Sequence, residues 1–229
     1  ACIPLSGWLA DRFGVRNTYF AAIIIFTLAS LGCAAAASLN ELLFYRVIQG
    51  IGGALLLPVG RLAMLKIIPR TQFLSAMSLM SLAGLIGPLI GPTLGGWLVE
   101  VATWHWIFLI NIPMGILGCL ITFKAMPNVT EPSVQRFDLW GFLLLVIAMA
   151  GLSLGIENFA STSLSLYWSL GLICAGLAAA VLYALHSHTH QNALFRSKLF
   201  NNRIYAIGII GNFFAAVGTM VHKEPPFRK

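Results

Sequence analysis

The chain has 229 residues, of which 59% are hydrophobic and 9% are charged, and its mean hydropathy is +0.87. Soluble domains carry about a quarter charged residues, and a water-soluble protein this apolar would expose large hydrophobic patches. In a bilayer the same composition is expected, because lipid solvates the outer surface. The net charge of +7 is scattered between apolar runs rather than gathered in one basic patch, which argues against a nucleic-acid-binding protein.

Windows without charges mark the expected membrane helices, each close to the roughly 20 apolar residues that cross a bilayer. The sequence opens on Ile3–Ala10, which is typical of the tail of a helix. We therefore expect an all-α, polytopic transmembrane bundle. After that tail, six further spans and the beginning of a seventh are predicted over Thr18–Ala37, Leu42–Leu65, Phe73–Val99, Trp106–Ala125, Leu139–Ile156, Leu166–Leu185 and Ile204–Met220.

Loops with Lys and Arg alternate with loops that lack both. Because positively charged loops stay in the cytoplasm, the basic loops are expected there. The chain is thus predicted to be a multi-pass membrane protein. The loops without Lys or Arg are Ser38–Glu41, the turn near Glu100 and Glu157–Ser165. The basic loops hold Arg12 and Arg16, Lys66 and Arg70, Lys124 and Arg136, and Arg196, Lys198 and Arg203.

The two ends of the sequence depart from this pattern. The chain does not open with Met, shows no signal peptide, and ends in a basic segment, 221–229, that would lie outside by alternation. We expect a partial chain whose anomalous tail results from a frameshift or a truncation.

Residues that could support metal or catalytic chemistry are few. The cysteines lie far apart without a Cys-x-x-Cys pair and are expected to be core residues or free thiols. His186 and His190 would share a helix face and could bind metal, but a hydrated helix end is the preferred interpretation. Asp138 fits a helix N-cap. We expect no catalytic group and no metal site, so an enzyme is not expected. The cysteines are Cys2, Cys33, Cys119 and Cys174.

The first motif, Gly7-x-x-x-Asp11-Arg12-x-Gly14-x-Arg16, lies in a short loop between two expected helices. Gly14 permits a sharp chain reversal. An aspartate beside two arginines at helix ends can form charge-assisted contacts and meet the helix dipoles. The alternative interpretation is a generic basic turn.

The second motif, Arg46-x-x-Gln49-Gly50-x-Gly52-Gly53, lies inside the second full span. A guanidinium about one turn inside the membrane costs at least ~2.5 kcal/mol on insertion scales, so Arg46 is expected to face a cavity or a partner. Gln49 lies on the same face, and Gly50 and Gly53 are expected to allow close helix packing. The alternative is an arginine that snorkels to the outer interface.

The third motif combines a stripe of glycines with two prolines in one span. Glycines repeated every four residues present a smooth surface to another helix. Pro88 and Pro92 each remove a backbone hydrogen bond, a cost that a moving interface would explain. The alternative is a static packing helix. The motif comprises Gly84, Gly87, Pro88, Gly91, Pro92, Gly95 and Gly96.

These three motifs, in this order on consecutive helices, resemble the major facilitator superfamily, whose antiporter signature is the Gly–Pro helix. Two further phrases resemble the fourteen-helix drug:proton antiporters (EmrB/QacA-like) of that superfamily. They are Trp104-His105-Trp106-Ile107-Phe108 with Asn111-Ile112-Pro113, and Arg136-Phe137-Asp138-Leu139-x-Gly141. Three further phrases resemble one subgroup of these antiporters, a type of multidrug resistance protein. They are Asn40-Glu41-Leu42-Leu43, Pro58-Val59-Gly60-Arg61 and Leu194-Phe195-x-x-Lys198-Leu199-Phe200.

The resemblance implies a role for each motif. In the family, the loop motif latches the cytoplasmic side between the transporter halves, and the position of Arg46 is implicated in proton coupling. The Gly–Pro helix lies at the interface between the halves. Here the loop motif ends Gly14-Val15-Arg16-Asn17, with fewer basic residues than many members have, which is expected to weaken the latch.

The resemblance also divides the chain. Residues 1–126 would belong to the N-terminal bundle, from the end of helix two to helix six, and 127–190 would form a linker with the extra helices seven and eight. Residues 191–220 would hold a cytoplasmic loop and the first helix of the C-terminal bundle, followed by the tail 221–229. The family's first helix, with a membrane-embedded acidic residue that helps to carry the proton, would lie upstream. The chain would then supply part of one wall of the central cavity.

The function that this resemblance implies is secondary active efflux of drugs, or of other hydrophobic or cationic compounds, in exchange for protons by alternating access. The location that it implies is the inner (cytoplasmic) membrane of a bacterial cell. The expected partners are a small drug-like substrate, protons and the lipid bilayer, with no nucleic acid; accessory efflux proteins stay open. No cofactor is expected, because the proton gradient supplies the energy. The alternatives are a metabolite exporter or a symporter on the same fold, and a non-functional truncated fragment.

Overall fold

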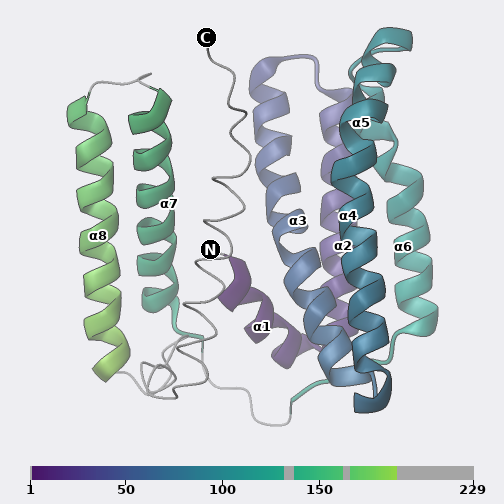
Figure 1. Ribbon diagram of the computed structural model, residues 1–229, viewed down its shortest axis with the longest axis horizontal. Helices are drawn as coiled ribbons and strands as arrows, with labels where there is room; N and C mark the ends of the chain where they lie inside the picture. The colour runs from purple at the N-terminus through teal and green to yellow at the C-terminus, as the bar shows by residue number, and fades with distance from the viewer. Residues whose placement is uncertain (1, 132–136, 162–165, 190–229) are drawn as a thin grey trace. The chain divides into compact units, whose positions relative to one another are not determined.

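The computed structural model describes residues 2–131, 137–161 and 166–189, and every regular element in these ranges is an α-helix (Figure 1). The chain divides into two compact units, Cys2–Gln135 and Arg136–Lys229. Six helices are long and apolar enough to cross a membrane within the described ranges. The all-α, polytopic fold predicted from the sequence is therefore confirmed, whereas the predicted span Ile204–Met220 and the tail 221–229 lie outside the described residues.

The unit Cys2–Gln135 contains the first six helices. The opening helix α1 confirms the predicted helix tail, and the spans that follow match the predicted ones within a few residues at each end. The helices are α1 (Cys2–Phe13), α2 (Val15–Ala35), α3 (Leu39–Ile67), α4 (Arg70–Val101), α5 (Trp106–Leu109) and α6 (Asn111–Ala125).

Local sequence explains where α3 begins. Ser38 is its N-cap, and the Ser38 hydroxyl accepts a hydrogen bond from the Glu41 amide at 3.3 Å. The Glu41 carboxylate in turn accepts the Ala37 amide at 2.9 Å. This reciprocal arrangement satisfies backbone N–H groups that have no partner inside the helix. It extends α3 by one turn beyond the predicted start at Leu42.

The predicted single span Trp106–Ala125 is divided into α5 and α6, with a turn at Ile110. Pro113 lies in the first turn of α6 and has no N–H to donate to the carbonyl four residues earlier, that of Leu109. The apolar character is continuous across this turn, so the two pieces together still have the length of one membrane span.

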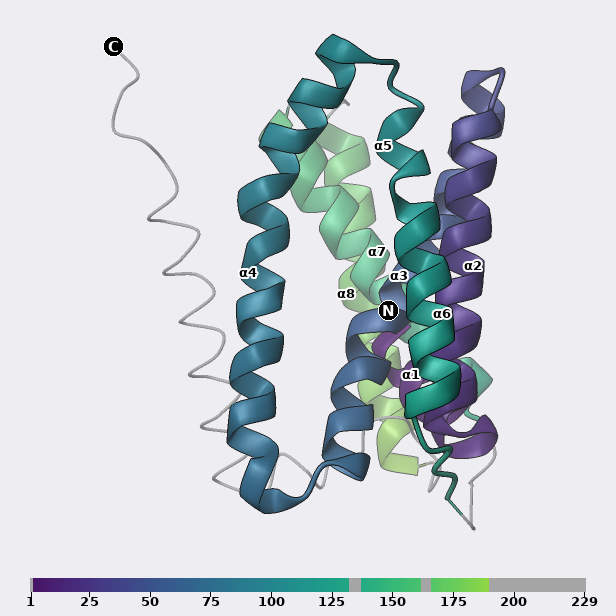
Figure 2. The same ribbon diagram turned by 90° about the vertical axis from the view of Figure 1, so that its right-hand side faces the viewer.

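Small residues let the helices of this unit approach closely. A core of Ala10, Val15, Ala22, Val59 and Ala63 joins α1, α2 and α3. α6 packs against α2, whereas α4 packs against α3 and α5 and stands apart from α2 and α6 along most of its length (Figure 2). The window of α4 that would span the membrane has no buried residue within the described structure.

The second unit is described by its two helices, α7 (Leu139–Ser161) and α8 (Leu166–Thr189), which pack side by side. Their backbones come very close: a Cβ on Gly176 would lie 2.8 Å from the Leu152 nitrogen, and one on Gly151 would lie 2.9 Å from the Leu172 oxygen. Such small-residue contacts are a common way for membrane helices to associate.

Candidate functional site

A polar network lies within the apolar helices α2, α3 and α6. The Gln49 side chain, which is 6% exposed, donates from Nε2 to the hydroxyl of fully buried Ser30 at 2.7 Å. Asn111 Nδ2 lies 3.4 Å from the same hydroxyl, which itself donates to the Phe26 carbonyl at 2.8 Å. Arg46 Nη1 donates to Gln49 Oε1 at 3.3 Å. The expectation that Gln49 lies on the same helix face as Arg46 is therefore confirmed.

The guanidinium of Arg46 sits at the open side of this network. It lies over the ring of Phe108, with Cζ 4.6 Å from the ring centroid, and Phe108 itself is buried. Because α3 begins at Leu39, Arg46 lies about 10 Å along the helix by the usual rise per residue. Cation–π stacking and one hydrogen bond to an amide offset part of the cost of holding a charge at this depth.

Gly52 makes the closest contact with α2, and the close-packing role predicted for Gly50 stays a prediction. A Cβ on Gly52 would lie 2.7 Å from the Phe26 nitrogen, whereas nothing lies within 4 Å of one on Gly50. Gly53 has ordinary contact with the Phe26 ring, at 3.5 Å. The helix face that carries Gln49 and Gly52 therefore packs on α2, and Gly50 faces open space in the described structure.

The loop motif at the α1–α2 turn forms a different ion pair from the expected one. Asp11 does not pair with its neighbouring arginines among the described residues; its Oδ1 lies 2.7 Å from Nζ of Lys66, at the end of α3. The same Nζ lies 2.8 Å from Oε1 of Glu131. Lys66 and Glu131 were not predicted as site residues. In the sequence, Lys66 indicates only that its loop is basic and therefore cytoplasmic. Glu131 lies between two expected spans, in a segment without any periodic pattern.

The segment 126–131, which we call the strap, follows α6 and lies on the α1–α2 turn. The Glu131 amide donates to the Asp11 carbonyl at 3.1 Å, and the Val15 amide donates to the Val129 carbonyl at 3.1 Å. Gly14 has a φ of 89°, and a Cβ at this position would collide with the Asn128 side chain. The reversal predicted at Gly14 is thus confirmed, and the space beside it is filled by the strap.

The two arginines of the loop motif contact aromatic rings. Arg12 lies over Trp8 and Arg16 over Phe123, each with Cζ 5.7 Å from the ring centroid. The Nε atom of Arg16 is buried and makes no hydrogen bond with the described residues. These contacts hold the arginines at the end of the bundle where the helices α1, α3 and α6 finish. The predicted gating role of the motif stays a prediction.

The Gly–Pro motif lies along the exposed helix α4. The helix continues through both prolines, and a Cβ on any of the motif's glycines would meet nothing within 4 Å in the described structure. The predicted contact of this stripe with another helix therefore stays a prediction. The glycines concerned are Gly84, Gly87, Gly91, Gly95 and Gly96.

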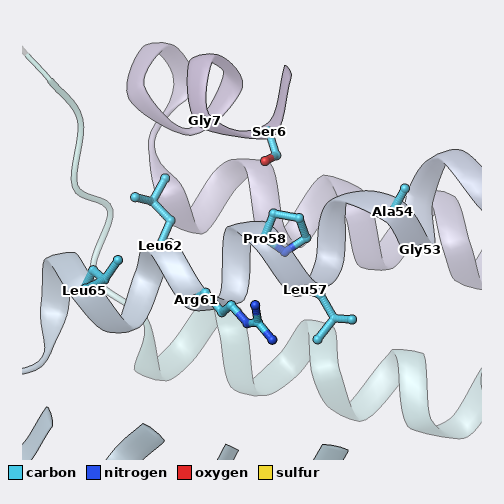
Figure 3. Close-up of a pocket in the computed structure, with 9 residues that line it drawn as sticks. All are labelled: Ser6, Gly7, Gly53, Ala54, Leu57, Pro58, Arg61, Leu62 and Leu65. Carbon is cyan, nitrogen blue, oxygen red and sulfur yellow. The ribbon is translucent and has the colours of Figure 1, made fainter. Parts of the chain in front are cut away.

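A cavity of about 580 Å³ lies between α1 and α3 (Figure 3). Its volume falls in the range of drug-binding pockets, and its lining is mostly apolar. Ser6 points from α1 toward Pro58 of α3, whereas Leu57 and Arg61 point from α3 away from α1 (Figure 3). Arg61 supplies the one charge of the lining, and Gly7, predicted as part of the gate, lies in the cavity wall.

No group of three or more His, Cys, Asp or Glu side chains that could hold a metal ion is found in the part of the chain that the structure describes. His186 contacts the Asp138 carboxylate instead, with Nε2 2.9 Å from Oδ2. Asp138 Oδ1 accepts the Gly141 amide at 2.9 Å, which confirms the predicted N-cap. His190 lies outside the described residues.

The comparison with known families now adds to this geometry. The sequence profile of the Major Facilitator Superfamily matches residues 1–222. The chain belongs to the major facilitator superfamily.

Three relatives narrow the position of the chain within this superfamily. Proteins named "Putative multidrug resistance protein MdtD" from Escherichia coli O139:H28 (strain E24377A / ETEC), Escherichia coli (strain K12 / DH10B) and Shigella boydii serotype 18 are each 52% identical to it over 217 residues. The match covers 95% of this chain and 46% of each relative, so the chain spans about half the length of these relatives. This similarity confirms the type of member that the sequence phrases indicated.

Membership of the superfamily and six apolar helices together make this a multi-pass membrane protein. In such a protein, a charged side chain within a span is expensive and marks a functional pathway by default. Arg46 and its buried partners in α2, α3 and α6 are therefore the candidate functional site.

Proposed function

We propose that this chain forms part of a secondary active transporter that exports hydrophobic, drug-like molecules in exchange for protons by alternating access. The observation that carries the proposal is the hydrogen-bonded Arg46–Gln49 pair inside α3, stacked on Phe108. Families of transporters use such intramembrane polar groups at the interface between their repeats. The multidrug resistance named for the relatives supports the drug-like substrate.

Arg46 is proposed to act as a fixed charge rather than as the proton carrier. A guanidinium stays protonated at physiological pH, so it cannot release the transported proton. The described membrane helices hold carboxylates only near their ends, for example Glu41 and Glu100. The titrating group is thus proposed to come from another part of the transporter. Arg46 would favour its ionised form and so help to release the proton.

The described cavity supports the hydrophobic half of the expected substrate class more than the cationic half. Its lining between α1 and α3 is apolar apart from Ser6 and Arg61. An apolar lining gains free energy by removing apolar ligand surface from water. A guanidinium repels a cation at short range. We therefore propose neutral hydrophobic compounds as the first substrates to test.

The remaining parts of the proposal concern movement and location. The ion pairs of Asp11 and Lys66 would close the cytoplasmic end, and the exposed Gly–Pro stripe of α4 would slide against the other half of the transporter. The location proposed is the inner membrane of a bacterium, because the relatives are bacterial and the helices are apolar.

The test is drug-dependent proton release in everted membrane vesicles from cells that make a full-length transporter carrying this chain. Respiration sets up the proton gradient, and a pH-sensitive dye reports its collapse when a hydrophobic drug is added. We expect Arg46→Ala to abolish the response while the amount of inserted protein stays the same. Arg70→Ala is the matched control, because Arg70 lies at the start of α4, outside the network.

Two results would contradict the proposal. If no drug releases protons although the protein is inserted, metabolite export or loss of function replaces drug:proton exchange. If Arg46→Ala responds like the unchanged protein, the transporter assignment holds and the role of Arg46 is wrong.

A further inference from the structure

The Ser30 hydroxyl occupies the centre of the buried network and uses all its bonding capacity there. A hydroxyl has one hydrogen to donate and two lone pairs to accept with. Ser30 donates its hydrogen to the Phe26 carbonyl at 2.8 Å. It accepts from Gln49 Nε2 at 2.7 Å and from Asn111 Nδ2 at 3.4 Å. Each capacity of this hydroxyl therefore has one partner.

This saturation decides which way the Gln49 amide points. The Gln49 side chain has a donor end and an acceptor end that are almost the same size, so packing alone hardly distinguishes them. A hydroxyl whose hydrogen is already used can only accept, so it binds the NH₂ end of Gln49. The oxygen end then faces Arg46, where Oε1 accepts from Nη1 at 3.3 Å.

The reversed amide would be unfavourable at both ends. Its oxygen would face the Ser30 oxygen, and its NH₂ group would face the N–H groups of Arg46. Buried polar groups that meet like partners lose their hydrogen bonds and pay the full cost of desolvation. With Gln49 buried and Ser30 fully buried, water cannot repair this mismatch.

We propose that Ser30 is a positioning residue of the transporter, which keeps the Gln49 oxygen turned toward Arg46 and so holds the guanidinium in place for proton coupling. Asn111 takes the second lone pair of Ser30 and thereby supports the same orientation from α6. The inference rests on the proposed function for its consequence in coupling, whereas the orientation of the amide rests on the hydrogen bonds alone.

A double-mutant cycle in drug-dependent proton release tests the positioning role. In a full-length transporter carrying this chain, Ser30→Ala should lower the coupled proton flux by about fivefold to tenfold, the factor expected when one buried hydrogen bond is lost. In the Gln49→Met background the same change should cost less than about twofold, because no amide is left for Ser30 to orient.

The control is Ser78→Ala on α4. The Ser78 hydroxyl also donates to the carbonyl four residues earlier, that of Leu74 at 3.0 Å, but it is exposed and belongs to no described network. It should leave the flux unchanged. If Ser30→Ala lowers the flux by the same factor in both backgrounds, Ser30 acts only through packing and the positioning role is overturned.

A second cycle does not depend on transport. Thermal unfolding of the detergent-purified transporter is measured for Ser30→Ala, Gln49→Ala and the double variant. We expect the double variant to lose clearly less in Tm than the two single losses added together, because both changes remove the same bond. Additive losses would overturn the proposal.

The proton-flux cycle depends on the proposed transport function, whereas the thermal-unfolding cycle tests the Ser30–Gln49 hydrogen bond without it. If the unchanged transporter releases no protons with any drug but the thermal losses are non-additive, the proposed function fails and the Ser30–Gln49 orientation stands. If Gln49→Met is itself inactive, the thermal cycle alone decides.

Discussion

Gly14 shows how a single residue determines the turn between α1 and α2. Its φ of 89° lies in the left-handed region, where a side chain crowds the backbone. The Asn128 side chain of the strap also occupies the space that a Cβ would take. Both observations require glycine at this position, and the first was predictable from the short loop alone.

We expect Gly14→Ala to destabilise the protein by about 1–2 kcal/mol, because an alanine must adopt the left-handed conformation and displace Asn128. The matched control is Gly7→Ala in α1, where a Cβ meets nothing within 4 Å. There the change should be neutral or stabilising by about 0.5–1 kcal/mol, since glycine weakens a helix interior. Thermal unfolding in detergent measures both, and equal effects would show that the backbone conformation of Gly14 is not the cause.

The strap is the first element whose attachment can be tested. Lys66 joins it to the α1–α2 turn by pairing with Asp11 and Glu131, whose side chains are 38% and 50% exposed. Ion pairs this exposed contribute little stability, typically below about 1 kcal/mol each. Their consequence should therefore be seen in the position of the strap rather than in global unfolding.

We expect Lys66→Gln to raise the rate at which a thiol reagent labels Val129→Cys, a half-buried position of the strap, severalfold, with a small change in Tm. Lys124→Gln is the control, because Lys124 ends α6 and has no ion pair in the described structure. Labelling that does not change in Lys66→Gln would mean that the two backbone hydrogen bonds alone hold the strap. High salt should also raise the labelling rate of the unchanged protein, since it screens exposed pairs.

The helix pair α7–α8 depends on the closeness of its backbones. We expect Gly176→Leu to destabilise the pair by about 1–3 kcal/mol, because a Cβ would lie 2.8 Å from the Leu152 nitrogen and the helices must separate. Gly171→Leu on the same helix is the control, since a Cβ there meets nothing within 4 Å. The rate at which two cysteines engineered on facing positions of the helices form a disulfide with an added oxidant, followed as the temperature rises, would report their separation. Equal sensitivity of the two variants would contradict this account of the packing.

At the scale of the whole molecule, the placement of charges in the unit Cys2–Gln135 predicts which of its ends faces the cytoplasm. The α1–α2 turn, the end of α3 and the strap meet at one end, which the Lys66 ion pairs demonstrate. The loop at Ser38, which has no Lys or Arg, lies at the opposite end of α3. The positive-inside tendency predicts that the first of these ends faces the cytoplasm.

Labelling with a membrane-impermeant thiol reagent tests this orientation. We expect Asn40→Cys to react in intact cells and Thr71→Cys to react only in everted vesicles. The native cysteines are first replaced, since Cys33, Cys119 and Cys174 are free thiols. The opposite pattern of labelling would reverse the predicted topology of the whole unit.

The sequence was sufficient to predict the spans and to place Gln49 on the helix face of Arg46. Hydropathy determines the spans directly, and the two side chains lie three residues apart on one helix, where such neighbours meet. It was insufficient for contacts between distant helices. No local sequence pattern predicts that Ser30 and Asn111 contact the Gln49 network or that Glu131 pairs with Lys66, because these contacts depend on how distant helices pack.

The sequence also could not show that Gly52, rather than Gly50, packs against α2. Both lie in one glycine-rich stretch, and only the direction in which α2 approaches α3 distinguishes them. The break at Ile110 could have been predicted, because Pro113 removes a helical hydrogen bond at a known distance along the chain.

The strap also bears on the order in which the protein is made. Lys66 lies 55 residues after Asp11 and 65 residues before Glu131, so a growing chain forms its first ion pair well before its second. At ordinary rates of synthesis the gap lasts roughly 3 to 13 s, while α4, α5 and α6 enter the bilayer. If one of the two spans, α4 or α5 with α6, fails to cross the bilayer, Glu131 ends on the opposite side of the membrane from Lys66. The second pair can then not form, so its closure requires that the chain return to the side of Lys66 after α6.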